Sequence, residues 1–371
     1  MKGISTAQAA PGLVRTSFDK ISGWNTDDHA SALTAFVRVC RQAPQVFKKK
    51  PLDLSSARVR ELCARGEAAL GRGNEDARSF FESEFTPHHF SSSGFLTGYF
   101  EPELPASRIK TDDFATPLLK APEGLVAITD RNRPDGWANE LSHGRLTDKG
   151  LVPLPDRPAI MDGALQKEEL EFVYLADPID AFFVHVQGSA RLKLDDGSVM
   201  RVGYAGKTGH PYTSIARVLV NRGEGRPEDL TASGLRKWLQ DNPDKRDDLF
   251  RENRSFIFFR EVQLDDPQDG PVGSVGIPLV AGRSLAVDPT HIPYGAPVFV
   301  SADISGISDN PISFPRLVIA DDTGSAIRGA ARGDLFAGSG AEAGRIAGEL
   351  RHGARMTVLL PRKRTTQGSK G

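Results

Sequence analysis

The sequence is poor in several features that mark particular classes of protein. It has two cysteines, Cys40 and Cys63, and no cysteine and histidine spacing typical of a metal site. We therefore expect two reduced thiols in the core, rather than a disulfide, and no bound metal. No apolar run reaches the about 18 residues that a membrane-spanning helix needs. The 47 lysines and arginines nearly balance the 48 aspartates and glutamates, which leaves a net charge of -1 and no field that would attract nucleic acid.

Motifs for nucleotides and for serine hydrolases are also lacking. Neither a P-loop nor a dinucleotide fingerprint occurs, and no Ser-His-Asp order is recognisable, so no cofactor is expected. At the N-terminus, Ala7-Gln8-Ala9 has the small-x-small form of a cleavage site left after removal of a leader. No charged and then apolar leader precedes it.

The length of 371 residues and an apolar content of 39% predict two domains, each with its own core. Helical spacing predicts helices over 17–50, 55–70 and 74–84, the first capped by Asn25 or Thr26. The segment 95–104 alternates as a strand through Tyr99 and then stops at Pro102 and Pro105, and the chain from there to about 170 is loop-rich. Residues 171 to 205 are predicted to be entirely β, with a hairpin turn at DDGS, 195–198. Helices are expected over 214–222, 231–241, 244–251 and 339–350, and strands over most of the remainder.

The chemistry is expected in the stretch RLVIADDTGSAIRGAARGDLFAGSG, residues 316 to 340. An apolar strand there delivers two carboxylates, Asp321 and Asp322, onto a loop of small residues, and Asp334 follows. Asp288 comes after another short strand, SLAV. Strands that are distant in sequence meet in a barrel, and converging carboxylates raise the pKa of one of them. An acid that stays protonated near neutral pH is what protonation of a glycosidic oxygen requires.

Two further stretches carry polar and aromatic groups suited to a sugar. HVQGSAR, residues 185 to 191, offers Gln187 and Ser189 around Gly188, where a ligand can approach the backbone. GYAGKTGHPY, residues 203 to 212, adds Tyr204 and Tyr212. Each stretch also fits an ordinary turn, and His210 is interpreted as a structural histidine.

Six segments in order resemble one known family. They are FLTGYFEPEL, DPIDAFFVHVQGSARLKLDDG, VGYAGKTGHPYTSI, SFIFFRE, GSVGIPLVAGRSLAVD and DDTGSAIRGAARGDLFAGSGAEAG, which together cover roughly residues 94 to 360. The sequence is similar to the membrane-bound lytic murein transglycosylase A family, including its C-terminal three-aspartate module. GSAI stands where Gly-Gly is common in that family, and two aspartates stand where one is usual.

The resemblance implies a mainly β fold of the α+β class with N-terminal helices. A double-psi β-barrel domain would comprise residues 1–104 and 252–371, a smaller inserted β-barrel domain residues 105–251, and a glycan groove would lie between them. The resemblance further implies cleavage of the β-1,4 bond between N-acetylmuramic acid and N-acetylglucosamine, without metal or water, to a 1,6-anhydro product. The expected partner is the peptidoglycan glycan strand. The expected location is the periplasm, with outer-membrane association, a cell-wall enzyme complex and the oligomeric state left open.

The resemblance also assigns site residues. Asp334 matches the family's catalytic aspartate, Asp322 its supporting aspartate, and Asp288 completes the three. Asp321 stays an alternative to Asp322, which we prefer because it keeps the register to Gly324. The residues placed along the glycan are Thr97, Gly98, Tyr99, Asp180, Gln187, Gly188, Ser189, Tyr204 and Tyr212.

Parts of the sequence are also compatible with two other functions. A barrel of this kind can bind polysaccharide without cutting it, so a non-catalytic peptidoglycan-binding module is the alternative. An aspartic-protease-like hydrolase is prompted by Asp322-Thr323-Gly324, but it would need a second Asp-Thr/Ser-Gly copy, and Asp288 is followed by proline.

Overall fold

The computed structural model describes residues 12–263, 266, 269–304 and 312–362. The chain divides into two compact units. Unit 1 comprises Met1–Phe100, Gln268–Gly338 and Glu342–Gly371, and unit 2 comprises Glu101–Pro267 and Ser339–Ala341. The leader-cleavage prediction at residues 7 to 9 lies outside the described residues.

Unit 1 contains a closed β-barrel. Its sheet has the order β1-β2-β17-β14-β15-β13-β16-β3, and β17 also pairs with β3. This extra pairing closes β17, β14, β15, β13, β16 and β3 into a six-stranded ring, which leaves those strands without free edges. The strands are β1 (Leu13–Arg15), β2 (Phe85–Phe90), β3 (Gly94–Glu101), β13 (Ser284–Val287), β14 (Pro297–Ile304), β15 (Ile312–Asp322), β16 (Arg332–Ser339) and β17 (Arg351–Pro361). A six-stranded closed ring is what the expected double-psi barrel requires, and the mainly β class with N-terminal helices is confirmed.

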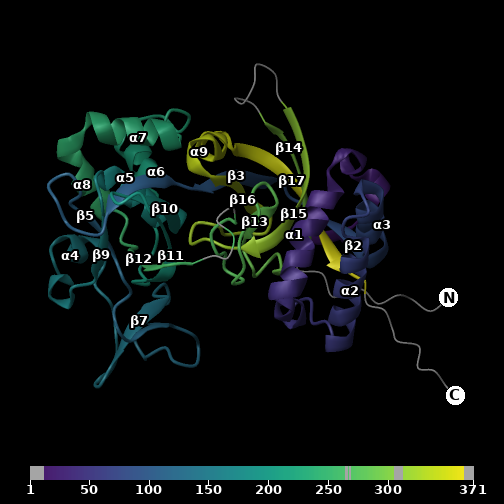
Figure 1. Ribbon diagram of the computed structural model, residues 1–371, viewed down its shortest axis with the longest axis horizontal. Coiled ribbons are helices and arrows are strands. Elements are labelled where there is room, and N and C mark those ends of the chain that lie inside the picture. Colours follow the sequence, from purple (N-terminus) through teal and green to yellow (C-terminus); the bar gives the residue numbers. More distant parts are fainter. Residues whose placement is uncertain (1–11, 264–265, 267–268, 305–311, 363–371) are drawn as a thin grey trace. The chain divides into compact units, whose positions relative to one another are not determined.

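Three helices, α1 (His29–Gln42), α2 (Ser56–Ala69) and α3 (Asn74–Glu84), lie together in unit 1 (Figure 1). Short 3-10 turns flank α1 at Phe18–Lys20, Trp24–Thr26 and Pro44–Lys48. The predicted helix over 17–50 is therefore too long. Its caps were also wrong, because Asp28, and not Asn25 or Thr26, accepts the hydrogen bond from the Ser31 backbone. Helix α9 (Gly340–Glu349) follows β16.

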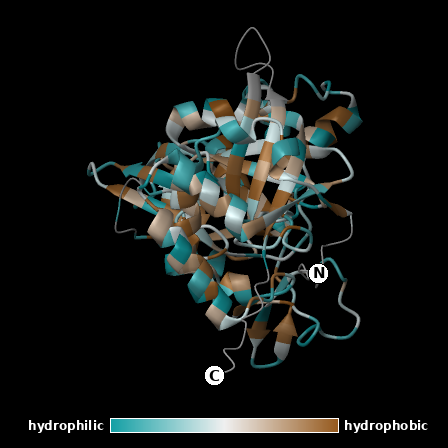
Figure 2. Ribbon diagram, turned by 90° about the vertical axis from the view of Figure 1, so that its right-hand side faces the viewer, coloured by the Kyte–Doolittle hydropathy of each residue, from teal (hydrophilic) through white to brown (hydrophobic). Residues whose placement is uncertain are grey.

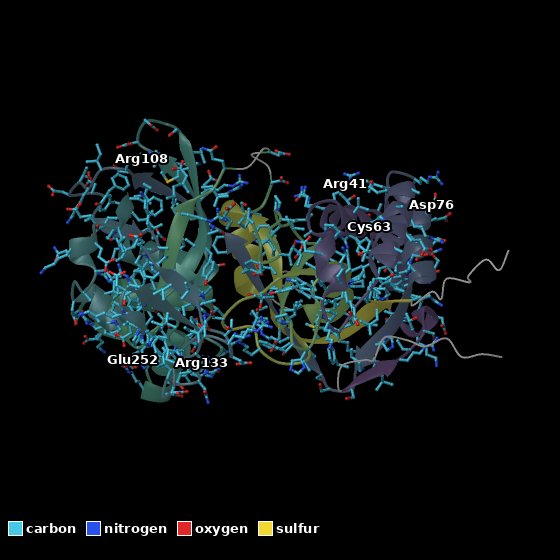
Figure 3. All side chains as sticks on the ribbon, turned by 90° about the horizontal axis from the view of Figure 1, so that it is seen from below. Arg41, Cys63, Asp76, Arg108, Arg133 and Glu252 are labelled. Carbon is cyan, nitrogen blue, oxygen red and sulfur yellow. A yellow bond between two sulfur atoms is a disulfide. The ribbon has the colours of Figure 1, made fainter. Side chains whose placement is uncertain are left out.

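Cys40 and Cys63 form a disulfide, so the expectation of two reduced thiols was wrong. Cys40 lies on α1 and Cys63 on α2, and packing of these helices brings their Cα atoms to 5.4 Å. That separation falls in the range a disulfide needs. Figure 3 shows Cys63 among the helices, next to Arg41, which forms an ion pair with Glu67 one turn beyond Cys63.

Unit 2 is built on a second sheet, of the order β12-β11-β10-β4-β9-β5. A single bridge between Lys120, just after β5, and Phe259 of β12 joins its two ends, as a smaller barrel requires. These strands are β4 (Glu103–Ser107), β5 (Thr116–Leu119), β9 (Glu171–Leu175), β10 (Ser189–Leu194), β11 (Val199–Lys207) and β12 (Ile257–Glu261). A separate three-stranded sheet contains β6 (Leu125–Ala127), β7 (His143–Thr147) and β8 (Gly150–Val152). Strand β12 thus belongs to this unit, although the sequence prediction placed residues from 252 onward in the catalytic domain.

The helices of unit 2 are α4 (Arg157–Met161), the 3-10 turn Gln166–Glu168, α5 (Pro178–Gln187), α6 (Ile215–Arg222), α7 (Ala232–Asp241) and α8 (Pro243–Arg251). Helix α5 corrects the prediction that residues 171 to 205 are entirely β. Asp177 caps its N-terminus, and Pro178 occupies the first turn, where a missing N–H costs nothing. Ile179 and Phe182 are buried at helical spacing on it.

Apolar residues concentrate in the barrel strands. Residues 317 to 320 of β15, which precede the two aspartates, are all 0% exposed. Figure 2 shows several strands brown along much of their length, whereas helices carry teal residues beside brown ones. Within the described ranges, no helix is both long and apolar enough to cross a membrane.

Candidate active site

Asp322 and Asp334 lie on the two strands that flank β13 in unit 1. The parallel register pairs Ala286 of β13 with Asp322 of β15, and the antiparallel register pairs the same Ala286 with Asp334 of β16. Neighbouring strands are about 4.8 Å apart, so the backbones at the two aspartates are roughly 10 Å apart. The barrel thus brings together two carboxylates from strands that both pair with β13.

A register shift distinguishes Asp321 from Asp322. Leu285 pairs with Ala320 and the next residue, Ala286, with Asp322, so Asp321 is the extra residue of a β-bulge. Asp321 is 1% exposed and accepts a hydrogen bond from Ser284 Oγ at 2.7 Å. Burial raises the pKa of Asp321 well above its ordinary 3.8, and the nearby charge of Asp322 adds to this shift. Asp322 instead accepts a hydrogen bond from Tyr99 on β3, and its charge acts on Asp334. This geometry favours Asp322 over Asp321 as the partner of Asp334.

Asp322 is held by three donors. The hydroxyl of Tyr99 on β3 donates to Oδ2 at 2.7 Å, and the backbone N–H and hydroxyl of Ser274 donate to Oδ1 at 2.8 and 2.6 Å. An aspartate that acts as acceptor in every bond is held in one orientation as a negative charge. Burial and the charge of Asp322 raise the pKa of Tyr99 well above 10.0, so Tyr99 keeps its proton.

Asp334 has a different environment. Burial raises its pKa, a hydrogen bond from the Thr97 hydroxyl and the charge of Arg332 act to lower it, and the charge of Asp322 raises it further. The net direction is upward. One carboxylate is thus fixed as an acceptor while the other retains a proton to higher pH, an arrangement that divides acid and electrostatic roles between the two.

The carboxylate of Asp288 accepts hydrogen bonds from residues of the neighbouring loops. It accepts from the Thr290 hydroxyl at 2.7 Å, from the Thr290 N–H at 3.1 Å and from the Gly329 N–H at 2.9 Å. Burial acts to raise its pKa, but these bonds and the charge of Arg328 outweigh burial and lower it. Asp288 therefore ties the turn after β13 to the loop that precedes β16, and it is not placed to act as an acid.

The three predicted site residues on β3 make different contacts. Thr97 contacts Asp334 and Tyr99 contacts Asp322. Gly98 faces α9, because a Cβ on it would lie 2.8 Å from Ala347 Cα and 2.9 Å from Leu350 Cδ1. Glycine is therefore needed at this position for the close packing of β3 against α9, independently of any role in binding a ligand.

The other predicted glycan contacts lie in unit 2. Asp180 on α5 forms an ion pair with Arg236 at 2.6 Å. Gln187 ends the same helix, Gly188 forms its C-cap with a φ of 82°, and Ser189 opens β10. Tyr204 on β11 is 46% exposed, and Tyr212 follows that strand.

His210 is structural, as the sequence predicted. Its Nε2 lies 2.8 Å from the Leu154 carbonyl and its Nδ1 lies 3.2 Å from Arg254. Both ring nitrogens are therefore occupied within unit 2.

Sequence reasoning missed three residues at the aspartates of unit 1. They are Ser274, which binds Asp322, Tyr294, whose pKa is raised by burial and by Asp322, and Arg332, which lies beside Asp334. GSVG at 273–276 was part of the resemblance, but no pattern in it indicated a bond to an aspartate 48 residues away.

Comparison with known proteins identifies the family of this chain. The MltA specific insert domain matches residues 95–260, and the 3D domain matches residues 283–360. The crystal structure of a membrane-bound lytic murein transglycosylase from Agrobacterium tumefaciens is 39% identical, with a TM-score of 0.85. The match covers 95% of this chain and 98% of that one. The chain belongs to the MltA family.

Other MltA proteins are similar at lower identity. MltA from Neisseria gonorrhoeae is 29% identical with a TM-score of 0.77, over 97% of this chain and 96% of that chain. Membrane-bound lytic murein transglycosylase A of Escherichia coli K12 is 32% identical over 272 residues, which are 71% of this chain. This alignment spans 65% of the E. coli protein.

Proposed function

We propose that this chain is a lytic murein transglycosylase. It would cleave the β-1,4 bond between N-acetylmuramic acid and N-acetylglucosamine and form 1,6-anhydro-N-acetylmuramic acid without water. The observation that carries the proposal is the pairing of Asp334, whose pKa is raised, with Asp322, which is fixed by three donors. The names of the relatives from A. tumefaciens and E. coli support lytic murein transglycosylase activity in general.

Asp334 would serve as acid and then as base. Its proton goes to the glycosidic oxygen as the bond to C1 of the muramic ring breaks, and the ring gains oxocarbenium character. The C6 hydroxyl of the same ring attacks C1, and its proton returns to the Asp334 carboxylate. An intramolecular nucleophile gains from proximity, so the protein needs no second carboxylate to activate water.

The fixed negative charge of Asp322 has two effects in this scheme. It helps to keep the proton on Asp334 before the reaction, and it faces the positive charge that develops on the sugar ring. Tyr99 and Ser274 hold that charge in place. Asp288 would contribute by holding the loop before β16 rather than by transferring a proton.

Glycan binding is proposed for the remaining predicted residues. Thr97, Gly98 and Tyr99 lie on the strand beside Asp334, and Tyr204, which is 46% exposed, has an aromatic ring of the kind that stacks on sugars. The remaining proposed contacts are Asp180, Gln187, Gly188, Ser189 and Tyr212. A structure of E. coli MltA, 23% identical to this chain, carries bound chitohexaose, a glycan oligomer.

The disulfide supports a location outside the reducing cytosol. Disulfides persist in oxidising compartments such as the bacterial periplasm. The Cys40–Cys63 bond therefore agrees with a periplasmic enzyme that meets peptidoglycan directly.

The test is mass analysis of murein sacculi after incubation with the wild type, Asp334→Asn and Asp322→Asn. We expect anhydro-muropeptides from the wild type and a loss of about 100-fold or more for Asp334→Asn, the usual contribution of a general acid. Asp322→Asn should retain a measurable fraction, because it removes a charge and not the transferred proton. Reducing-end products would mean that water is the nucleophile. Retained sedimentation with murein and no products from the wild type would indicate a non-catalytic binding module.

A further inference from the structure

Arg332 lies on β16, two residues before Asp334. One of its terminal nitrogens donates to Thr97 Oγ1 at 2.7 Å, and the other donates to the Gly333 carbonyl. The guanidinium also lies over the ring of Phe95, 5.6 Å from the ring centroid. These contacts from β3 and β16 hold the positive charge beside the catalytic aspartate.

The donor at Thr97 determines where the hydroxyl hydrogen points. A guanidinium can only donate, so the Arg332 bond occupies an acceptor position of Thr97 Oγ1. The hydroxyl has a single hydrogen, and its other polar neighbour is Asp334 Oδ1. The hydrogen of Thr97 is therefore directed at Asp334, and the three groups form a chain in which each donates to the next.

We propose that Arg332 is a positioning residue for the catalytic acid: it orients the Thr97 hydroxyl so that Asp334 Oδ1 always accepts, and the transferred proton resides on Oδ2. This proposal rests on the proposed function. Nothing in the three-aspartate pattern assigns such a role, and the role of Arg332 is exerted through Thr97 and Asp334.

The chain of bonds matters most in the second half of the reaction. After Asp334 Oδ2 has protonated the glycosidic oxygen, the carboxylate keeps the Thr97 bond on Oδ1, and the charge of Arg332 stabilises it. Oδ2 is then free to accept the C6 hydroxyl proton. The proton thus leaves from and returns to the same oxygen, which faces away from Thr97.

Charged and titratable groups on the strands around Asp334 also affect its pKa. The charge of Asp322 on β15 raises the pKa of Asp334. On β3, Tyr99 interacts with Asp322, Asp321 and Asp334. On β17, Arg351 is the register partner of Thr97. Strand β13 contributes Ala286, which is uncharged. Arg332 is the positive group that acts directly on Asp334 and opposes the rise of its pKa.

The test uses Arg332→Met and Arg332→Lys, with Thr97→Val, Thr97→Ser and the double variant Arg332→Met/Thr97→Val. For Arg332→Met we expect kcat to fall several-fold with KM within about twofold, and the alkaline limb of kcat/KM to move to higher pH, because Asp334 then retains its proton longer. Arg332→Lys should restore the wild-type limb in part. In the Thr97→Val background, Arg332→Met should cause a smaller loss of kcat than in the wild type, because the link is already broken. Arg355→Met, at an exposed arginine of the same sheet, is the matched control and should leave kcat unchanged.

A second measurement does not depend on activity. In protein labelled with ¹³C at the aspartate carboxyls, the Asp334 resonance is the one absent from Asp334→Asn, and its titration gives the pKa directly. That pKa should be higher in Arg332→Met than in the wild type or Arg355→Met. An unchanged Asp334 titration, or fully additive losses in the double variant, would overturn the proposal. A wild type that releases no anhydro products while the Asp334 titration still shifts would overturn the proposed function and leave the positioning intact.

Discussion

Asp322 and Asp334 have the same register partner, Ala286 of β13. Ala286 is 3% exposed and stands on the central strand between them. Directly paired residues of an antiparallel ladder project to the same face, so the methyl group of Ala286 lies on the side of Asp334. The space between the carboxylates therefore depends on a small side chain at this position.

Ala286→Val should separate or tilt the two carboxylates. We expect a fall in activity of about 100-fold, because a displacement of about 1 Å at a catalytic group can have that effect. The measurement is the initial rate of anhydro-muropeptide release from sacculi, together with the melting temperature to show that the protein is folded.

The matched control is Ala302→Val on β14. Ala302 is also buried in the barrel, at 5% exposed, and its register partners are Phe314 and Ala354 rather than aspartates. Overpacking should cost about 1–3 kcal/mol of stability at either position. Equal losses of rate in the two variants would mean that general strain, and not the spacing of the carboxylates, accounts for the result.

Asp321 should make stability depend on pH. Burial raises its pKa well above 3.8 in the folded protein, so the folded state holds a proton that the unfolded chain releases. Its contribution is fully present below pH 3.8 and is lost as the pH rises through the folded pKa. The asparagine side chain in Asp321→Asn does not titrate, so this contribution to the pH dependence of stability is absent from the variant. At pH 8 the variant should therefore be more stable than the wild type, and this difference should disappear near pH 3.5.

Urea unfolding across this pH range checks the sign. Asp76→Asn, at an exposed position of α3 (Figure 3), changes the charge equally without removing a buried carboxyl, and its stability should parallel the wild type. A constant offset between Asp321→Asn and the wild type at all pH values would contradict the prediction.

The sequence pointed to Asp322 and Asp334 as candidate site residues, but it did not explain why Asp321 and Asp322 stand in a row. Their position after an apolar strand is a local pattern, and the register to Gly324 favoured Asp322. The bulge at Asp321 is a property of the pairing between β13 and β15. Their paired residues, such as Ala286 and Asp322, are 36 positions apart, and one sequence does not show this alignment. Arg332 was missed for the same reason, since it meets Thr97 across 235 residues.

Helix α5 shows how composition can mislead. Its run PIDAFFVHVQ is rich in aromatic and β-branched residues, which favour strands. The Asp177-Pro178 start was the available helix signal, and burial of residues on more than one side of the helix obscured its period. By contrast, the hairpin between β10 and β11 and helices α2 and α3 were predicted correctly, because turn and spacing signals agreed there.

The disulfide gives a prediction about the helical part of unit 1. Cys40 and Cys63 are separated by 23 residues, and closing a loop of that size stabilises a fold by about 3 kcal/mol. The variant Cys40→Ala/Cys63→Ala should lose about that much in urea unfolding. Thiol titration of the unfolded wild type without reductant should find no reactive cysteine. Two reactive thiols per chain would restore the original expectation from the sequence.

The last prediction concerns the ion pair between Asp27 and Arg283. Both side chains are buried, at 6% and 8% exposed, and Arg283 donates to the two carboxylate oxygens at 3.0 and 3.2 Å. Asp27 also accepts from the Leu317 N–H at 2.6 Å, at the start of the buried run that leads to Asp322. Asp27→Ala would leave the buried Arg283 without its buried carboxylate, with only the Leu317 carbonyl at 2.7 Å and the exposed Asp28 at 3.9 Å remaining, which should cost about 3–5 kcal/mol.

Glu67→Gln, which breaks the exposed pair with Arg41, is the contrast to this variant. Solvent screens that pair, so urea unfolding should show little change. If Asp27→Ala were as stable as Glu67→Gln, water or another group would have to reach Arg283. In that case the attachment of the N-terminal turn to β15 would depend on apolar packing, with the buried charges contributing little. A loss confined to Asp27→Ala would instead show that this pair fixes the strand from which Asp322 emerges.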